Sequence, residues 1–347
     1  MDRIKTAENS PAKRQLKHLG LLLAAATLTA CGGGGGDGSS TGTLNVGLTD
    51  APVENAAQVV VAFAGIEIKP KDGPALDPIP VDEENCDSYD ANSELCYIDL
   101  LTLTGTERKL VFSGDLPAGE YNWIRLLVEA EENVMDSYIK FDDDTQCSLY
   151  IPSGAETGLK IVSGITVTAN GVSDYTLDFD VKKSITQPPG KLGDLEACAA
   201  NYKLKPAIRI VDTTTTGDIF GTVPEALLAS DEKCTMDQGI YTNASVYVFE
   251  DPDSLAVADD FDGTDDAVTS ALVEWDGLEY NYEVGYLLAP ETYKLALTCT
   301  PDLDDVEVDD YDPDSLDPQD FGFVDEISVD TLVEQVVDGS FSAPPAP

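Results

Sequence analysis

The chain is strongly acidic: its 347 residues include 65 Asp and Glu against 20 Lys and Arg, for a formal net charge of −45. This balance excludes nucleic acid as an expected partner, because binding to phosphates depends on Lys and Arg. The only histidine, His18, lies near the N-terminus. The rest of the chain therefore has no histidine for a Ser-His or Cys-His nucleophile, for a histidine-ligated zinc site or for an imidazole proton shuttle.

Residues 1–30 have the two regions of a secretory signal in the expected order, a basic segment and then an uncharged apolar stretch from Leu19 to Ala30. That stretch is shorter than the roughly twenty residues that a membrane-spanning helix needs, so we predict a removable signal peptide. Leu28 to Cys31 resembles the lipobox of bacterial lipoproteins, and the resemblance implies that Cys31 is lipidated and becomes the mature N-terminus. An ordinary signal peptide that is cut beside a cysteine is the alternative.

Residues 31–41 are rich in Gly and Ser, a composition typical of a flexible tether. In Gram-negative lipoproteins an aspartate directly after the lipidated cysteine signals retention in the inner membrane, but Gly32 occupies that position here. We therefore expect an envelope lipoprotein anchored in the outer membrane. Removal of residues 1–30 leaves 15 basic and 63 acidic residues, a net charge of −48.

Besides Cys31, the chain has an even number of cysteines, which in an exported protein predicts disulfides. Several pairings are open, and closeness in sequence favours Cys86 with Cys96, Cys147 with Cys198, and Cys234 with Cys299. A metal site is the alternative, but the chain has no Cys-x-x-Cys spacing to support it.

Residues 42–213 are predicted to form the first of two consecutive β-sandwich domains of an all-β protein. Short segments alternate apolar and polar residues and are separated by Gly, Pro, Asn and Asp, a pattern typical of strands and turns. The only helical candidate is a short one around Ile98 to Leu103. The predicted strands are Leu44 to Leu48, Val59 to Ile68, Lys109 to Phe112, Tyr121 to Glu129, Tyr138 to Phe141, Ser148 to Ile151, Leu159 to Val162, Ile165 to Thr168, Tyr175 to Val181 and Leu204 to Val211.

Two details of this domain follow from the same pattern. Asn170-Gly171 lies between two strand-like segments and predicts a hairpin turn. The strand that begins at Tyr121 places Trp123, Leu126 and Val128 in or near the core, since an aromatic stripe is more often packing than a ligand platform.

Residues 214–300 are predicted to form the second β-sandwich, after a polar Thr-Gly run that marks the boundary. Residues 301–347 are rich in Asp and are predicted to be an acidic, largely disordered tail, with apolar segments at 321–324 and 332–337 that leave room for a strand or two. The predicted strands of the second domain are Ile219 to Val223, Ala244 to Phe249, Ala271 to Trp275, Tyr280 to Tyr286 and Tyr293 to Thr298.

The first domain contains five motif stretches in a fixed order: 42–52 (GTL and LTDAP), 116–125 (LPAGEY and WIR), 152–160 (PSG and TGLK), 178–184 (DFDVKKS) and 202–207 (YKLKPA). With these stretches the domain resembles the bacterial lipoprotein domain known as domain of unknown function 4382. The resemblance implies an exported β domain behind a lipobox and a Gly/Ser linker, and it implies no activity. The segment with Cys86 and Cys96 departs from the family pattern.

Residues 217–300 resemble, more weakly, a transthyretin-like or carboxypeptidase-regulatory-like sandwich. The resemblance rests on Gly221 to Val223, Ala244 to Phe249 and Tyr286 to Tyr293. Such modules commonly serve adhesion, spacing or contact with glycans.

The segment from Asp251 to Asp266 is a candidate calcium site, because calcium prefers several oxygen ligands. Asp260, Asp262 and Asp265 partly match the spacing of a calcium-binding loop, although the terminal glutamate is missing. A solvated run of charge is the alternative. Calcium is the only cofactor that the sequence suggests.

A second candidate site is basic. Six cations gather in the first domain, where they either form a patch for an anionic partner or pair with nearby carboxylates such as Asp178 and Asp180; we favour pairing across strands. They are Lys160, Lys182, Lys183, Lys203, Lys205 and Arg209.

Carboxylate pairs such as Glu129 with Glu131, or Asp178 with Asp180, have the residue types of a glycosidase, but an acidic chain contains such pairs by chance. We therefore expect a non-catalytic envelope lipoprotein that acts in binding, adhesion or scaffolding, with an envelope protein or a glycan as partner. The alternatives are a calcium-dependent carbohydrate-binding or adhesion protein, a glycoside-type hydrolase, and assembly by exchange of strands.

Overall fold

A computed structural model describes residues 40–51, 53, 56–152, 158–186, 202–205, 207–250, 267–304 and 322–345. The predictions for the signal peptide, for Cys31 and for most of the tether lie outside the described residues. In the part of the chain that is described, no helix is both long enough and apolar enough to cross a membrane.

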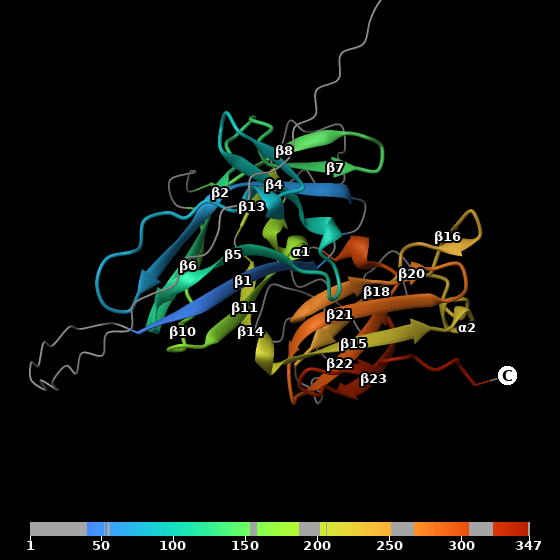
Figure 1. Cartoon of the computed structure of the whole chain (residues 1–347). Coiled ribbons are helices and arrows are strands. Elements are labelled where there is room, and N and C mark those ends of the chain that lie inside the picture. Colours follow the sequence, from blue (N-terminus) through green and yellow to red (C-terminus); the bar gives the residue numbers. More distant parts are fainter. Residues whose placement is uncertain are drawn as a thin grey trace, which may run out of the picture. The chain divides into compact units, whose positions relative to one another are not determined.

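The first module contains a four-stranded sheet, here called sheet 1 (Figure 1). Its strands lie in the order β14 (Ile208–Asp212), β11 (Val172–Asp180), β1 (Thr41–Ala51) and β5 (Lys109–Pro117). Strand β1 runs parallel to β11 and antiparallel to β5. Alternation in β1 turns Leu44, Val46 and Leu48 into the core, where each is fully buried.

The second sheet of this module, sheet 2, has ten strands built around β2 (Ala56–Pro70) and β6 (Gly119–Glu129). Short 3₁₀ turns, η1 (Glu83–Asn85) and η2 (Leu100–Thr102), connect parts of the module. The other strands are β3 (Ser88–Asp90), β4 (Leu95–Asp99), β7 (Tyr138–Phe141), β8 (Gln146–Tyr150), β9 (Leu159–Ile161), β10 (Ile165–Val167), β12 (Ile185–Thr186) and β13 (Tyr202–Leu204).

The second module has two further four-stranded sheets, and η3 (Thr213–Thr215) leads into it from the first. Sheet 3 has the order β20 (Glu274–Trp275), β21 (Tyr280–Leu288), β15 (Thr216–Val223), β24 (Val336–Asp338). Sheet 4 has the order β19 (Thr269–Leu272), β18 (Ser245–Phe249), β22 (Thr292–Thr298), β23 (Phe323–Asp330). The smaller elements are the ribbon of β16 (Met236–Asp237) and β17 (Ile240–Tyr241), the helix α2 (Glu225–Leu228) and the turn η4 (Pro301–Leu303).

Each module has its own hydrophobic core. Strands of sheets 1 and 2 supply the first core, in which Phe63, Ile66 and Phe179 are almost fully buried. Strands of sheets 3 and 4 supply the second, around side chains such as Tyr282 and Tyr293. The all-β sandwich-type fold predicted from sequence is therefore confirmed, and residues 39–347 belong to one compact unit.

The strand predictions hold with four local corrections. The predicted strand from Ala271 to Trp275 is two strands, β19 and β20, which belong to different sheets. Asn170-Gly171 does not form a hairpin, because β10 pairs in sheet 2 while β11 pairs in sheet 1. The segment from Ile98 to Leu103 is not a helix but the end of β4 followed by η2. The predicted strand from Leu204 to Val211 is two strands, β13 and β14, because a proline has no N–H to give to a sheet.

Residues 322–345 contain two strands, in the part of the predicted acidic tail where the apolar segments left room for a strand or two. Strand β23 pairs with β22, and β24 lies parallel to β15, so the last part of the chain completes both sheets of the second module. Only Val329 of β23 is almost fully buried, and β23 lies at the edge of sheet 4.

Two of the predicted disulfides are confirmed: Cys86 is bonded to Cys96, and Cys234 is bonded to Cys299. Cys147 is also in a disulfide. The partner predicted for it, Cys198, lies outside the described residues.

Candidate functional site at the junction of the two modules

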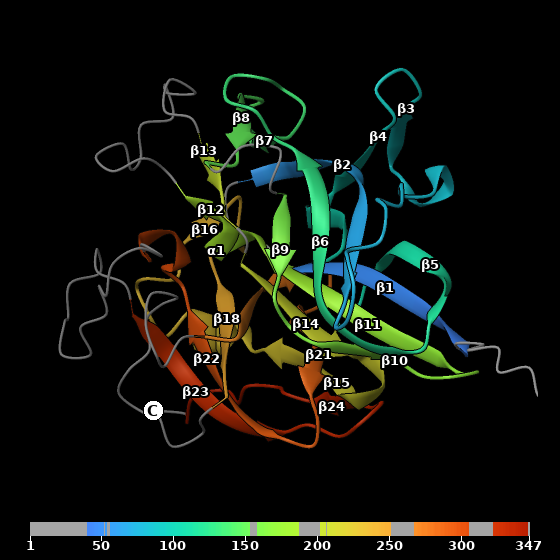
Figure 2. The ribbon, with the colours of Figure 1, turned by 90° about the vertical axis from the view of Figure 1, so that its left-hand side faces the viewer.

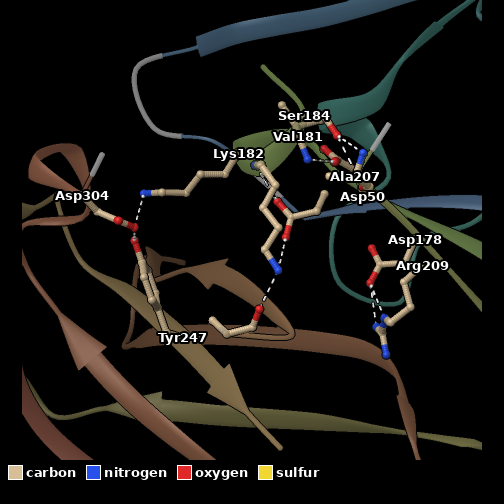
Figure 3. Close-up of polar contacts among 12 residues, drawn as sticks. Asp50, Asp178, Val181, Lys182, Ser184, Ala207, Arg209, Tyr247 and Asp304 are labelled. Atoms are coloured by element: carbon tan, nitrogen blue, oxygen red, sulfur yellow. Dashed lines mark hydrogen bonds and ion pairs between the residues drawn. The ribbon is translucent and has the colours of Figure 1, made fainter. Parts of the chain in front are cut away.

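A short helix, α1 (Val181–Ser184), follows directly after β11 and begins the candidate site (Figure 3). Asp180 is its N-cap, because a carboxylate oxygen of Asp180 accepts a hydrogen bond of 3.0 Å from the backbone N–H of Lys183. The parallel register of β1 and β11 brings the end of β1 to the same place, and Asp50 Oδ1 accepts from the N–H of Val181 at 3.2 Å. Two acidic side chains thus hold the start of α1.

Lys182 points from α1 to the second module and is only 5% exposed. Its Nζ donates to the carbonyl oxygen of Pro301 at 2.6 Å and lies 3.5 Å from Asp304 Oδ2. The hydroxyl of Tyr247 donates to the same Asp304 oxygen, and Lys182 Nζ lies 5.4 Å from the centre of the Tyr247 ring. A cation of the first module therefore neutralises a buried carboxylate of the second (Figure 3).

Lys183 makes a second link between the modules, since its Nζ donates to the carbonyl oxygen of Ala267 at 2.6 Å. The same Nζ lies 3.6 Å from Asp180 Oδ2. Burial raises the pKa of Asp180 to about 6, because the carboxylate is removed from water, and the charge of Lys183 only partly opposes this effect. Asp180 is therefore a group at this junction whose charge changes in mildly acidic conditions.

Arg209 and Asp178 face each other across β14 and β11. Arg209 Nη2 donates to Asp178 Oδ2 at 2.6 Å, and the Asp178 side chain is only 6% exposed. This ion pair is the cross-strand pairing that the sequence favoured for the basic residues.

A backbone contact joins the modules beside these ion pairs. A Cβ on Gly285 would lie 2.4 Å from the carbonyl oxygen of Gly105, so a side chain at position 285 has no room. The hydroxyl of Tyr286 donates to the carbonyl oxygen of Thr106 at 2.9 Å, and Thr106 Oγ1 donates to Glu283 Oε1 at 2.9 Å. A cavity of about 10 Å³, the size of one water molecule, lies here with Asp50 and Asp178 in its lining.

The six basic residues of the predicted patch occupy different settings. Lys182, Lys183 and Arg209 are engaged at the junction, as described above. Lys203 lies half-buried in β13, and the backbone N–H of Lys205 donates to the carbonyl oxygen of Ser184. Lys160 is exposed on β9, which pairs with β6 in sheet 2 (Figure 2).

Lys160 belongs to a separate cluster that the sequence analysis did not assemble. Lys160 Nζ lies 4.7 Å, and the guanidinium carbon of Arg125 lies 4.8 Å, from the centre of the Trp123 ring. Arg125 also donates to Glu67 at 2.8 Å. Leu126 and Val128 are in the core as predicted, whereas Trp123 is half-buried with these cations. Arg125 on β6 lies directly opposite Lys160 on β9. This neighbourhood could not be predicted from the sequence, because the sequence does not show which strands pair.

The structure does not assemble a site from the candidate carboxylate pairs, and it does not describe the candidate calcium loop. Asp178 and Asp180 are both buried in structural contacts, and Glu131 is exposed. Asp260, Asp262 and Asp265 lie outside the described residues. Within the described residues, no three His, Cys, Asp or Glu side chains converge to hold a metal ion.

The fold and the junction define an all-β protein of two sandwich modules linked by buried ion pairs. Residues 41–206, which hold most of the first module, match the family model "Domain of unknown function (DUF4382)". The resemblance predicted from five stretches is confirmed. The weaker transthyretin-like resemblance of the second module stays a prediction.

A search of curated proteins finds no match. Among solved structures, the chain is similar to a crystal structure described as "a putative adhesin from Bacteroides ovatus ATCC 8483", with 8% identity and a TM-score of 0.19. The match covers 93% of this chain and 100% of that one. A TM-score this low carries no argument about function.

Three of the five family stretches meet at α1. The register of β1 and β11 brings residues 48–51 beside 177–180, directly before α1. The N–H of Asp180 donates to the carbonyl oxygen of Ala207, and the N–H of Lys205 donates to the carbonyl oxygen of Ser184. These two bonds bring Lys205 and Ala207 of the fifth stretch to the same place. The residues that carry the resemblance therefore build the end of the first module that contacts the second.

Proposed function

We propose that this protein is a non-catalytic lipoprotein of the bacterial cell envelope, in which two rigidly joined β modules act as a binding or scaffolding body. The observation that carries the proposal is the junction itself. Lys182 with Asp304 and Arg209 with Asp178 are ionisable pairs of the kind that enzymes use, but each is buried in contacts between strands or modules. A catalytic acid, base or nucleophile has to reach its substrate, and these groups are already committed to structure.

The junction also suggests why two modules are kept together. Side chains of α1 are bonded to backbone oxygens of the second module, and Gly105 packs against Gly285. These contacts hold the modules in one compact unit, and a surface built from both modules then keeps its shape. A fixed surface favours binding, because less freedom is lost when the partner associates.

The location in this proposal rests on the sequence. Cys31 ends a lipobox-like segment, and the Gly-rich residues after it are typical of a tether that carries a folded body away from a membrane. Gly32 favours the outer membrane. A lipid on Cys31 would then supply the membrane as the first partner, and an envelope protein or glycan is proposed as the second.

Labelling of the full chain with a radioactive fatty acid, in a Gram-negative host, tests the lipid. Wild type is expected to incorporate label and to sediment with the outer membrane, and Cys31→Ser to lose both properties. A matched Cys86→Ser/Cys96→Ser variant removes cysteines elsewhere and should keep the label. An unlabelled wild type contradicts the lipid, and turnover of a glycoside by the purified chain contradicts the non-catalytic role.

The calcium-dependent alternative stays a prediction, because Asp260, Asp262 and Asp265 lie outside the described residues. Thermal unfolding of the full chain with calcium and with chelator measures it. A calcium-dependent rise in Tm that is lost in Asp260→Asn/Asp262→Asn would make calcium-dependent adhesion the better proposal.

A further inference from the structure

A cleft of about 300 Å³ lies between the modules, a volume at the lower end of the range for ligand-binding sites. Val53 and Leu101 of the first module and Phe220 of the second give it apolar walls. Its polar lining includes Glu274, Asn281 and Glu283. The cleft is distinct from the buried ion pairs of α1, and its lining contains none of those predicted site residues that the structure describes.

Sheet 3 fixes the relative positions of the groups that line the second-module wall. Phe220 on β15 is directly opposite Glu283 on β21, and Glu274 on β20 is directly opposite Asn281. Asn281 and Glu283 are two residues apart on one strand, so they share a face of the sheet. An aromatic ring, two carboxylates and an amide thus lie together on one face of a hydrogen-bonded sheet.

One of the carboxylates is also held from the opposite module. Thr106 Oγ1 donates to Glu283 Oε1 at 2.9 Å, beside the close contact of Gly105 with Gly285. Glu274 is exposed, and the Phe220 side chain is 41% exposed. The cleft therefore offers one positioned carboxylate, one accessible carboxylate and the accessible side of an aromatic ring.

The negative charge of the residues that line the cleft favours a positively charged ligand. Among the described residues that line the cleft there is no Lys, Arg or His to balance Glu274 and Glu283. A cation carried on an apolar stem fits such a site, because the stem packs on apolar walls while the charge meets carboxylates and the aromatic ring. Lys and Arg side chains have this chemistry.

We propose that the cleft between the modules binds a Lys or Arg side chain from a basic segment of a partner protein. This inference rests on the proposed binding function and names the chemistry of its partner. The acidic surface of the chain supports it, since a net charge of −48 after removal of residues 1–30 draws basic segments toward the molecule from a distance. The same charge attracts any polycation, so the test has to separate the cleft from the general field.

The test measures fluorescence anisotropy of a labelled peptide of alternating Lys and Ala, titrated with the purified full chain at physiological salt. Glu274→Gln/Glu283→Gln is expected to raise Kd about tenfold, because the charge-assisted contacts in the cleft are lost. The control, Glu225→Gln/Glu232→Gln, removes the same charge from exposed positions of the same module and is expected to stay within about twofold of wild type. Glu274→Gln alone, which leaves the Thr106 contact intact, and Phe220→Ser, which leaves the charge intact, are each expected to weaken binding.

Equal weakening in the cleft and control variants would overturn the proposal, because the peptide would then bind only to the general negative field. Unchanged binding in Glu274→Gln/Glu283→Gln overturns it as well. If n-butylamine binds as tightly as the peptide, the occupant is a small amine and not a protein segment. Failure of this test is separate from failure of the envelope role, since fatty-acid labelling of Cys31 does not depend on the cleft.

Discussion

Lys182 and Lys160 belong to the same module, but they have opposite surroundings. Lys182 is 5% exposed and faces the buried Asp304, whereas Lys160 is exposed and lies over the Trp123 ring. Both belong to the six basic residues for which the sequence left a patch open and favoured pairing with carboxylates. The comparison shows that the surroundings of a lysine, and not its residue type, decide whether it holds two modules together or lies on the surface.

The energetics of the two regions differ for the same reason. A buried ion pair gains little net stability, because both charges lose their hydration, but removal of one partner leaves an uncompensated charge inside the protein. An exposed cation on an aromatic ring keeps much of its hydration, and its loss costs about 0.5–1 kcal/mol. Substitutions at the two lysines should therefore differ severalfold in effect.

The largest expected effect is that of Lys182→Met. This change removes the Lys182 cation from the Asp304 carboxylate, which stays buried beside Tyr247, and we expect the free energy of unfolding to fall by about 3–5 kcal/mol. Urea unfolding of the full chain at neutral pH measures the change. Replacement of both partners, in Lys182→Met/Asp304→Leu, should recover most of the loss, because no unpaired charge then remains. If the double variant is less stable than the single one, the loss comes from packing and not from charge.

The second expected effect concerns Asp180 and depends on pH. Burial raises the pKa of Asp180 from 3.8 to about 6, so the folded state holds a proton that the unfolded state has already released between these values. The stability that this proton provides is complete below about pH 4 and is lost as pH rises through about 6. Wild type should lose about 3 kcal/mol relative to Asp180→Asn across this window.

Urea unfolding of both proteins at a series of pH values tests this difference. Lys183, Lys182 and Asp178 also act on Asp180, so the comparison with Asn at one position isolates its contribution. Asp212→Asn, which removes a carboxylate that similarly caps the turn η3, serves as the control for the loss of a capping group. A flat difference between wild type and Asp180→Asn would mean that Lys183 keeps Asp180 charged throughout.

The smallest expected effect is that of Lys160→Met, with a fall of about 0.5–1 kcal/mol in the free energy of unfolding. The same substitution is made at both lysines, so the pair of variants compares surroundings alone. The measurement is urea unfolding under the conditions used for Lys182→Met. A loss as large as that of Lys182→Met would contradict the distinction between the two regions.

Local patterns in the sequence were sufficient for most strands, because alternation of buried and exposed positions is a property of a few neighbouring residues. The pairing of Arg209 with Asp178 was also within reach, since both lie on predicted strands of the same domain. Asn170-Gly171 shows the limit of such patterns. The dipeptide correctly marks a turn, in which Asn170 has a φ of 55°, but a turn between two sheets has the same local chemistry as a hairpin.

The junction could not be predicted for a different reason. Lys182 and Asp304 are far apart in sequence, and Asp304 belongs to a run of aspartates in which no local feature distinguishes it. Its burial follows from the position of η4 beside Tyr247, which exists only after both modules have folded. The cleft is likewise a product of tertiary structure, since Glu283 and Phe220 become neighbours through strand register.

The way in which residues 323–338 complete the second module has a consequence for synthesis. Strands β15 and β22 gain partners from β24 and β23, near the end of the chain. Synthesis runs from the N-terminus to the C-terminus, so β15 and β22 are made before β23 and β24. Until those two strands are made, β15 and β22 each have an unpaired edge that is open to other strands. A chain cut short near residue 300 would keep those edges permanently, so premature termination should yield aggregates and not a shorter soluble protein.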